Sequence, residues 1–159
     1  MKIQALIAKI KVYFGQDELT VRRTGLDSIK PKLTKGCSMD VKHFDTYDLY
    51  IFKPDKLKTD GAVVYYHGGG FTVMHVYTYQ RFISNMAIEL GCIVFSPEYR
   101  LAPEHPFPEG DTDVYQATKH IYDHYKTYNI DRNAFTPNYT VLYGQTVTVC
   151  TRVTRVHRC

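Results

Sequence analysis

The chain has 159 residues, of which 44% are hydrophobic and 23% are charged. This length and composition are typical of one globular domain and exclude a disordered, collagen-like or membrane-bundle protein. The net charge is +4, and three of the positive charges are arginines of the tail 136–159, which contains no acidic residue. The rest of the chain is therefore close to neutral, which argues against a nucleic-acid-binding surface.

The first 40 residues are expected to form an N-terminal, cap-like segment. Residues 1–14 carry apolar side chains at helical spacing, interrupted by lysines. They predict a helix packed on the body, with a membrane-surface helix as the alternative. The segment has no signal-peptide cleavage pattern and is too short and too charged to span a bilayer. Residues 20–35 are polar and predict a loop. Localisation and membrane association stay open.

Residues 41–135 show alternating strand and helix signals. A strand or hairpin is expected at 41–53, a charged turn at 55–61 and a buried strand at 62–66 (AVVYY). A helix follows at 77–90, ended by Gly91, and then a strand at 92–95, closed by Pro97. A proline-rich loop leads to a helix at 111–128, which Asp111 or Thr112 can cap. This order predicts one α/β domain with a mostly parallel sheet and flanking helices.

Three consecutive glycines, Gly68, Gly69 and Gly70, follow the buried strand 62–66. Glycine permits backbone angles and close approaches that other residues do not. A tight turn is one explanation, and a loop whose N–H groups face a ligand is another. The spacing matches neither phosphate-binding glycine pattern, and no lysine follows. A His-Gly-Gly-Gly loop after a strand is instead typical of the oxyanion hole of lipases and esterases.

Two motifs together carry a family resemblance. Tyr66-His67-Gly68-Gly69-Gly70-Phe71 resembles the oxyanion motif of the hormone-sensitive-lipase family of α/β-hydrolases. About thirty residues later, the segment 98–108 (EYRLAPEHPFP) is similar to the second signature of that family. The segment 113–118 also resembles the arylacetamide deacetylase branch. The resemblance covers residues 41–133 and implies the N-terminal half of an α/β-hydrolase.

The resemblance implies roles for the residues of the glycine loop. Gly69 and Gly70 would donate their N–H groups to the oxyanion, supported by His67 and Gly68. Phe71 would line the acyl pocket, and His67 would brace the loop rather than move protons. The segment 99–108 would pack beneath the loop, and Arg100 and Glu104 would form a structural ion pair.

The nucleophile, the acid and the base that the resemblance implies are absent from the sequence. No serine occurs after Ser96, and no serine lies in a Gly-x-Ser-x-Gly turn. Thr146, in Gly-Gln-Thr, only faintly echoes the elbow. Residues 136–159 are a divergent tail of low complexity. We interpret the change near Ala134 as a departure of reading frame or splicing, with a homologous strand as the alternative. The central strand of the sheet would then be left partly unpaired.

No metal site and no cofactor are expected. The four cysteines form no CxxC pair, and a solvated helix face is favoured over a metal site for His120 and His124. By resemblance the function is hydrolysis of a small apolar carboxylic ester or arylacetamide. The chain as given is expected to be inactive. The alternative is a truncated pseudo-hydrolase that binds an apolar ligand or a partner without catalysis.

Overall fold

The computed structural model describes residues 18–28, 31–131, 139–142 and 145–150, the last two stretches as backbone only. The strands are β1 (Cys37–His43), β2 (Asp48–Pro54), β3 (Ala62–Tyr66), β4 (Ile93–Glu98), β5 (Tyr139–Leu142) and β6 (Gln145–Cys150). They form one sheet in the order β1-β2-β4-β3-β6-β5. The helices are α2 (Glu18–Asp27), α3 (Val76–Leu90) and α4 (Glu109–Asp123).

The predicted α/β fold is confirmed, and its described sheet is mixed. Among the described strands only β3 and β4 pair in parallel, with Val64 beside Phe95. β1 and β2 form an antiparallel hairpin, and β2 pairs antiparallel with β4. β3 and β4 are parallel because α3, which connects them, brings the chain back to the end of the sheet where β3 begins. β6 also pairs antiparallel with β3 and β5, so the described sheet is less parallel than expected.

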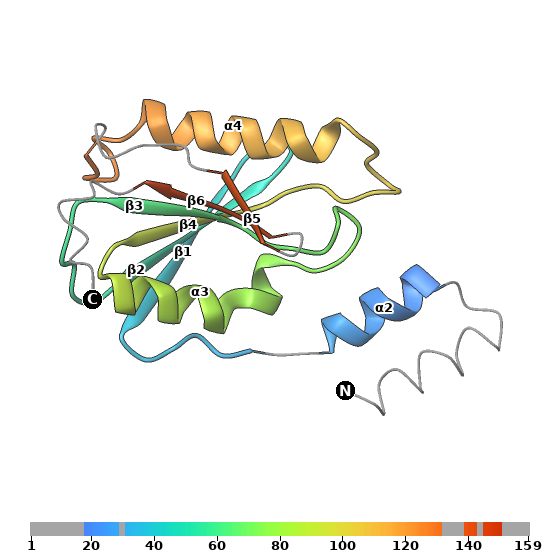
Figure 1. The fold of residues 1–159 in the computed structure, drawn as a ribbon, viewed down its shortest axis with the longest axis horizontal. Helices are drawn as coiled ribbons and strands as arrows, with labels where there is room; N and C mark the ends of the chain where they lie inside the picture. Colours follow the sequence, from blue (N-terminus) through green and yellow to red (C-terminus); the bar gives the residue numbers. More distant parts are fainter. Residues whose placement is uncertain (1–17, 29–30, 132–138, 143–144, 151–159) are drawn as a thin grey trace.

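α3 and α4 lie on opposite faces of the sheet (Figure 1). Side chains of β3 alternate between the two faces, as strand geometry requires. Val63 and Tyr65 pack with the α3 residues Ile83 and Ala87. On the other face, one cluster joins Val64 and Tyr66 of β3 to Ala117 and Ile121 of α4. All five residues of β3 are buried, so this strand lies at the centre of the core.

Several element predictions hold with shifted bounds. Gly91 ends α3 in the left-handed conformation at φ 62°. β4 continues through Pro97 to Glu98, past the expected end. Proline is tolerated there because the parallel pairing with β3 covers only residues 93–95, so one side of Pro97 needs no ladder bond. β1 begins at Cys37, inside the segment expected to precede the core.

The two predicted helix ends of α4 were wrong. The helix begins at Glu109, with Pro108 at the cap position and no side-chain cap, so neither Asp111 nor Thr112 caps it. Thr112 instead donates its hydroxyl back to the carbonyl of Pro108. The helix ends at Asp123, and turns follow up to Asn129, which has a positive φ of 54°.

The prediction of a loop over residues 20–35 was wrong at its start, because α2 occupies Glu18–Asp27. α2 has a weak apolar stripe, and only Val21 among its described side chains is buried. Its apolar pattern therefore gave no signal. The N-terminal segment 1–14 lies outside the described residues.

The prediction that the central strand, here β3, is left partly unpaired was also wrong. β6 pairs antiparallel with β3, with Tyr66 opposite Thr146, and β5 pairs with β6. The physical reason is the alternation of threonine and valine in the tail, which suits a strand that completes the free ladder of β3.

Candidate active site

The glycine loop follows β3 directly, and its backbone requires glycine at Gly69 and favours it at Gly70. Gly69 has φ 134° and Gly70 has φ 61°. A Cβ on Gly69 would lie 1.9 Å from the carbonyl oxygen of Val73. The carbonyl of Gly69 accepts hydrogen bonds from the amides of Thr72 and Val73, both at 3.2 Å. These bonds close a tight turn, which a side chain at Gly69 would prevent.

The amide N–H groups of Gly69 and Gly70 donate to no acceptor in the part of the chain that the structure describes. Both glycines are partly or fully accessible, unlike the buried Gly68. Two neighbouring unengaged N–H groups at the end of a buried strand are suited to bind an oxygen with negative charge. Whether they form an oxyanion hole stays a prediction.

His67 is buried beneath this loop. Its Nδ1 donates to the carbonyl of Gly68 at 3.0 Å, and its ring stacks on Tyr99 with centroids 4.3 Å apart. The Tyr99 hydroxyl donates to the carbonyl of His67. His67 Nε2 lies 3.5 Å from Glu98 Oε1, an ion-pair distance that is too long for a good hydrogen bond. Stacking on Tyr99 and the Nδ1 hydrogen bond hold the ring, as expected for a brace, while Nε2 has no hydrogen-bond partner among the described residues.

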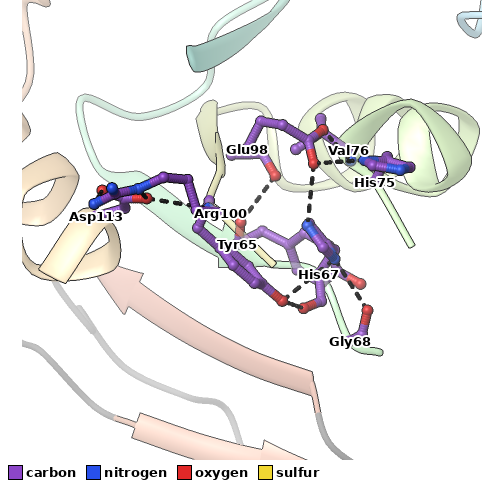
Figure 2. A network of polar contacts seen from close by, with 10 residues as sticks. Tyr65, His67, Gly68, His75, Val76, Glu98, Arg100 and Asp113 are labelled. Carbon is purple, nitrogen blue, oxygen red and sulfur yellow. Dashed lines mark hydrogen bonds and ion pairs between the residues drawn. The ribbon is translucent and has the colours of Figure 1, made fainter. Parts of the chain in front are cut away.

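Glu98 links the glycine loop to the start of α3 (Figure 2). Its carboxylate accepts hydrogen bonds from the amide of Val76 at 2.7 Å and from His75 Nδ1 at 3.0 Å. A carboxylate at a helix N-terminus binds the free N–H groups there and suits the helix dipole. Burial alone raises the pKa of Glu98, but the contacts with His67 and His75 outweigh it and lower the pKa.

Arg100 pairs with the fully buried Asp113 of α4 (Figure 2). Its Nε and Nη2 donate to the two carboxylate oxygens at 2.8 and 2.9 Å, and its backbone N–H donates to Oδ2 at 3.1 Å. Arg100 Nη1 binds Glu109 at 2.6 Å. The predicted Arg100–Glu104 pair was therefore wrong. The bidentate geometry of Asp113 draws the guanidinium toward α4, and Glu104 pairs with Arg23 instead.

Phe71 lines a small pocket beside the loop. The pocket has a volume of about 140 Å³, and its other apolar walls are Ala102, Phe107 and Gly110. Gly110 makes room for the Phe71 ring, because a Cβ there would meet that ring at 3.0 Å. Phe71 itself is 43% exposed. The position fits the expected acyl pocket, and that role stays a prediction.

The serines are engaged elsewhere. Ser96 is fully buried and donates to the carbonyl of Tyr65, and Ser84 donates to Arg81 and Thr34. Ser28 and Ser38 donate to main-chain carbonyls. Thr146 is described only through its backbone pairing with Tyr66. No described residue thus combines an exposed serine hydroxyl with a histidine partner.

His120 and His124 stack on each other, with ring centroids 4.2 Å apart. His120 Nε2 also lies 3.0 Å from the Tyr128 hydroxyl. Burial, and then the charges of Lys42 and His124, lower the pKa of His120 to about 4. Within the described residues no group of three or more metal-binding side chains comes together, and no helix is long and apolar enough to cross a membrane.

Sequence reasoning did not single out the partners that hold the loop. Glu98 and Asp113 appeared only as members of a motif, and Arg23 lay in a presumed loop. Their contacts join residues between 13 and 81 positions apart. A charged residue shortly after the predicted buried strand 92–95 was the available signal for Glu98.

The fold and this loop define an α/β-hydrolase. The family model of the alpha/beta hydrolase fold matches residues 63–145, more than half of the chain, and the chain belongs to this family. The resemblance to the hormone-sensitive-lipase family is thereby confirmed. The arylacetamide deacetylase branch stays a prediction.

Named relatives place the chain among esterase-like proteins. It is 38% identical over 71 residues to Esterase LipI of Mycobacterium tuberculosis, covering 45% of this chain and 22% of LipI. It is 39% identical over 74 residues to 2-hydroxyisoflavanone dehydratase of Glycyrrhiza echinata, covering 45% of this chain and 23% of the dehydratase. An esterase structure from Pyrobaculum calidifontis matches with a TM-score of 0.63 at 26% identity, covering 79% of this chain and 44% of the esterase chain. The chain thus spans about a quarter of these curated relatives and under half of that structure.

Proposed function

We propose that this chain supplies the oxyanion hole of a carboxylic ester hydrolase. The observation that carries the proposal is the pair of unengaged N–H groups on Gly69 and Gly70 at the end of the central strand. The family supports ester hydrolysis in general. The proposed substrate is a small apolar ester, with an arylacetamide as the related amide.

In the proposed reaction a nucleophile attacks the ester carbonyl carbon, and the carbonyl oxygen becomes an oxyanion. The N–H groups of Gly69 and Gly70 donate to this oxygen, and one such donor is typically worth about 3 kcal/mol of transition-state stabilisation. His67 keeps the loop in shape and moves no proton, because its ring is enclosed by Gly68, Tyr99 and Glu98. We assign the nucleophile, the acid and the base to no residue of this chain.

A binding role without catalysis is the second candidate. It is favoured by the absence of serine from residues 97–159 and by the engaged hydroxyls of the earlier serines. The pocket beside Phe71 would then hold an apolar group without turnover. The dehydratase among the relatives shows that similarity to this part of the fold extends to proteins not named as esterases.

The deciding experiment measures release of p-nitrophenol from p-nitrophenyl butyrate by the purified protein. If the proposal holds, the protein exceeds the buffer rate, because an oxyanion hole retains residual catalysis without its triad. Gly69→Ala then lowers kcat by about a hundredfold, because its Cβ would clash with the Val73 carbonyl and move the N–H donors out of place. Gly25→Ala is the control, because a Cβ at Gly25 meets nothing within 4 Å. Saturable binding of the ester with hydrolysis at the buffer rate would establish the binding role instead.

A further inference from the structure

Arg23 of α2 makes three hydrogen bonds to the segments that form the candidate site. Its Nε donates to the carbonyl of Thr72 at 2.8 Å, and its Nη2 donates to the carbonyl of Ala102 at 2.6 Å. Its Nη1 binds Glu104 at 2.7 Å, and its side chain is only 23% exposed. One guanidinium thus ties α2 to main-chain oxygens 49 and 79 positions further along the chain.

The two carbonyls belong to segments that already touch each other. The amide of Ala102 donates to the carbonyl of Phe71 at 2.7 Å, next to the Thr72 carbonyl that Arg23 binds. The amide of Thr72 in turn donates to the carbonyl of Gly69. Thr72 is therefore held by Gly69 through its N–H and by Arg23 through its C=O. This fixes the turn that directs the Gly69 and Gly70 amides.

Arginine suits this position for a geometric reason. Its guanidinium presents five N–H donors in a rigid plane, so it can bind two carbonyls and a carboxylate at once. A lysine ammonium carries charge but lacks this planar fork. The neighbouring Arg22 shows the contrast, since it is 62% exposed and pairs with Glu18 of its own helix.

We propose that Arg23 is a positioning residue that holds the glycine loop in the conformation needed for oxyanion binding, and so couples α2 to the active site. The catalytic part of this inference rests on the proposed function above. The structural part, that Arg23 keeps the 69–73 turn closed, stands independently of any activity.

Hydrogen–deuterium exchange tests the structural part. The reporters are the hydrogen-bonded amides of Thr72, Val73 and Ala102. Arg23→Ala should speed their exchange by about tenfold, the loss expected for a hydrogen bond to a charged group, while amides of β2 and β4 keep their rates. Arg22→Ala is the matched control on the same helix and should leave all of these amides unchanged.

Two results would overturn the proposal. One is equal exchange of the three reporter amides in Arg23→Ala and Arg22→Ala. The other is an equal increase across the whole sheet, which would make Arg23 a general contributor to stability. If Arg23→Ala does not fold, Arg23→Lys against Arg22→Lys carries the same test, because lysine keeps the charge and loses the fork.

Kinetics test the catalytic part on the same variants. With p-nitrophenyl butyrate, Arg23→Ala should lower kcat by about tenfold and leave KM nearly unchanged, since the loop binds the transition state rather than the ester. An unchanged kcat alongside faster exchange would overturn the catalytic part. A parent protein without hydrolysis, but with the exchange pattern above, would refute the proposed function and leave the structural role of Arg23 intact.

Discussion

β3 and the glycine loop are adjacent in the chain but are held in place by different forces. The five residues of β3 are buried on both faces of the sheet, against α3 on one side and α4 on the other. Their position follows from apolar burial and from the ladder bonds to β4 and β6. The strand would tolerate other apolar residues of similar size.

The glycine loop is held by polar contacts with distant segments. Tyr99, Glu98 and Arg23 each bind a different part of it or of its support. Such contacts are directional, so they fix the orientation of individual peptide groups, which apolar packing does not. The comparison suggests that the strand supplies stability, whereas the polar frame sets the geometry that the proposed chemistry needs.

The largest expected effect distinguishes the two glycines of the loop. Gly69→Ala should lower the free energy of unfolding by about 3 kcal/mol, because it adds a disfavoured φ to a clash with the Val73 carbonyl. Gly70→Ala should cost about 1 kcal/mol, since φ 61° is left-handed but its surroundings are open. Urea unfolding followed by circular dichroism measures both. Equal losses would show that the loop does not depend on the close approach at Gly69.

The sequence predicted the strand far better than the frame of the loop. AVVYY is a continuous apolar run, and the packing that it predicts depends only on this local pattern. Gly91 likewise ended α3 where a helix stop was expected. The glycine loop itself was recognised because three consecutive glycines after a strand are a strong local signal.

The supporting contacts could not be predicted in the same way. Arg100 has acidic residues at several distances along the chain, and only the folded position of α4 selects Asp113 over Glu104. α2 was missed because a long-range polar anchor such as Arg23 gives no periodic pattern in the sequence. Tertiary contacts override weak local preferences in such segments.

The next largest effect compares Tyr99, beside the glycine loop, with Tyr65 of β3. Replacing each by phenylalanine should change the free energy of unfolding in opposite directions. Tyr99→Phe should lower the free energy of unfolding by about 1.5 kcal/mol, because the carbonyl of His67 loses its hydroxyl donor. Tyr65→Phe should raise it by about 1 kcal/mol, because the buried Tyr65 hydroxyl has no hydrogen-bond partner among the residues that the structure describes. Urea titrations of both variants test this. A loss in both would mean that the Tyr65 hydroxyl has a partner, such as a buried water.

The smallest expected effect is a pH dependence that arises from Glu98. Its pKa is lowered in the folded protein, since the contacts with His67 and His75 outweigh burial. The unfolded chain therefore binds more protons as the pH falls below the ordinary carboxyl value of 4.5, and stability from Glu98 is lost in that range. Above it, this contribution is fully present. Glu98→Gln cannot titrate and should lack this part of the acid sensitivity.

The comparison to make is the difference in unfolding free energy between the parent and Glu98→Gln at several pH values. The parent should be the more stable at pH 6, and the difference should shrink as the pH falls below 4.5, with other carboxyl groups cancelling between the two proteins. The amide of Val76, which donates to Glu98, should lose protection over the same range in the parent, after correction for the intrinsic pH dependence of exchange. A difference near zero at every pH would mean that Glu98 acts through hydrogen bonds that a neutral amide can replace. The polar frame of the loop would then not depend on the charge of Glu98.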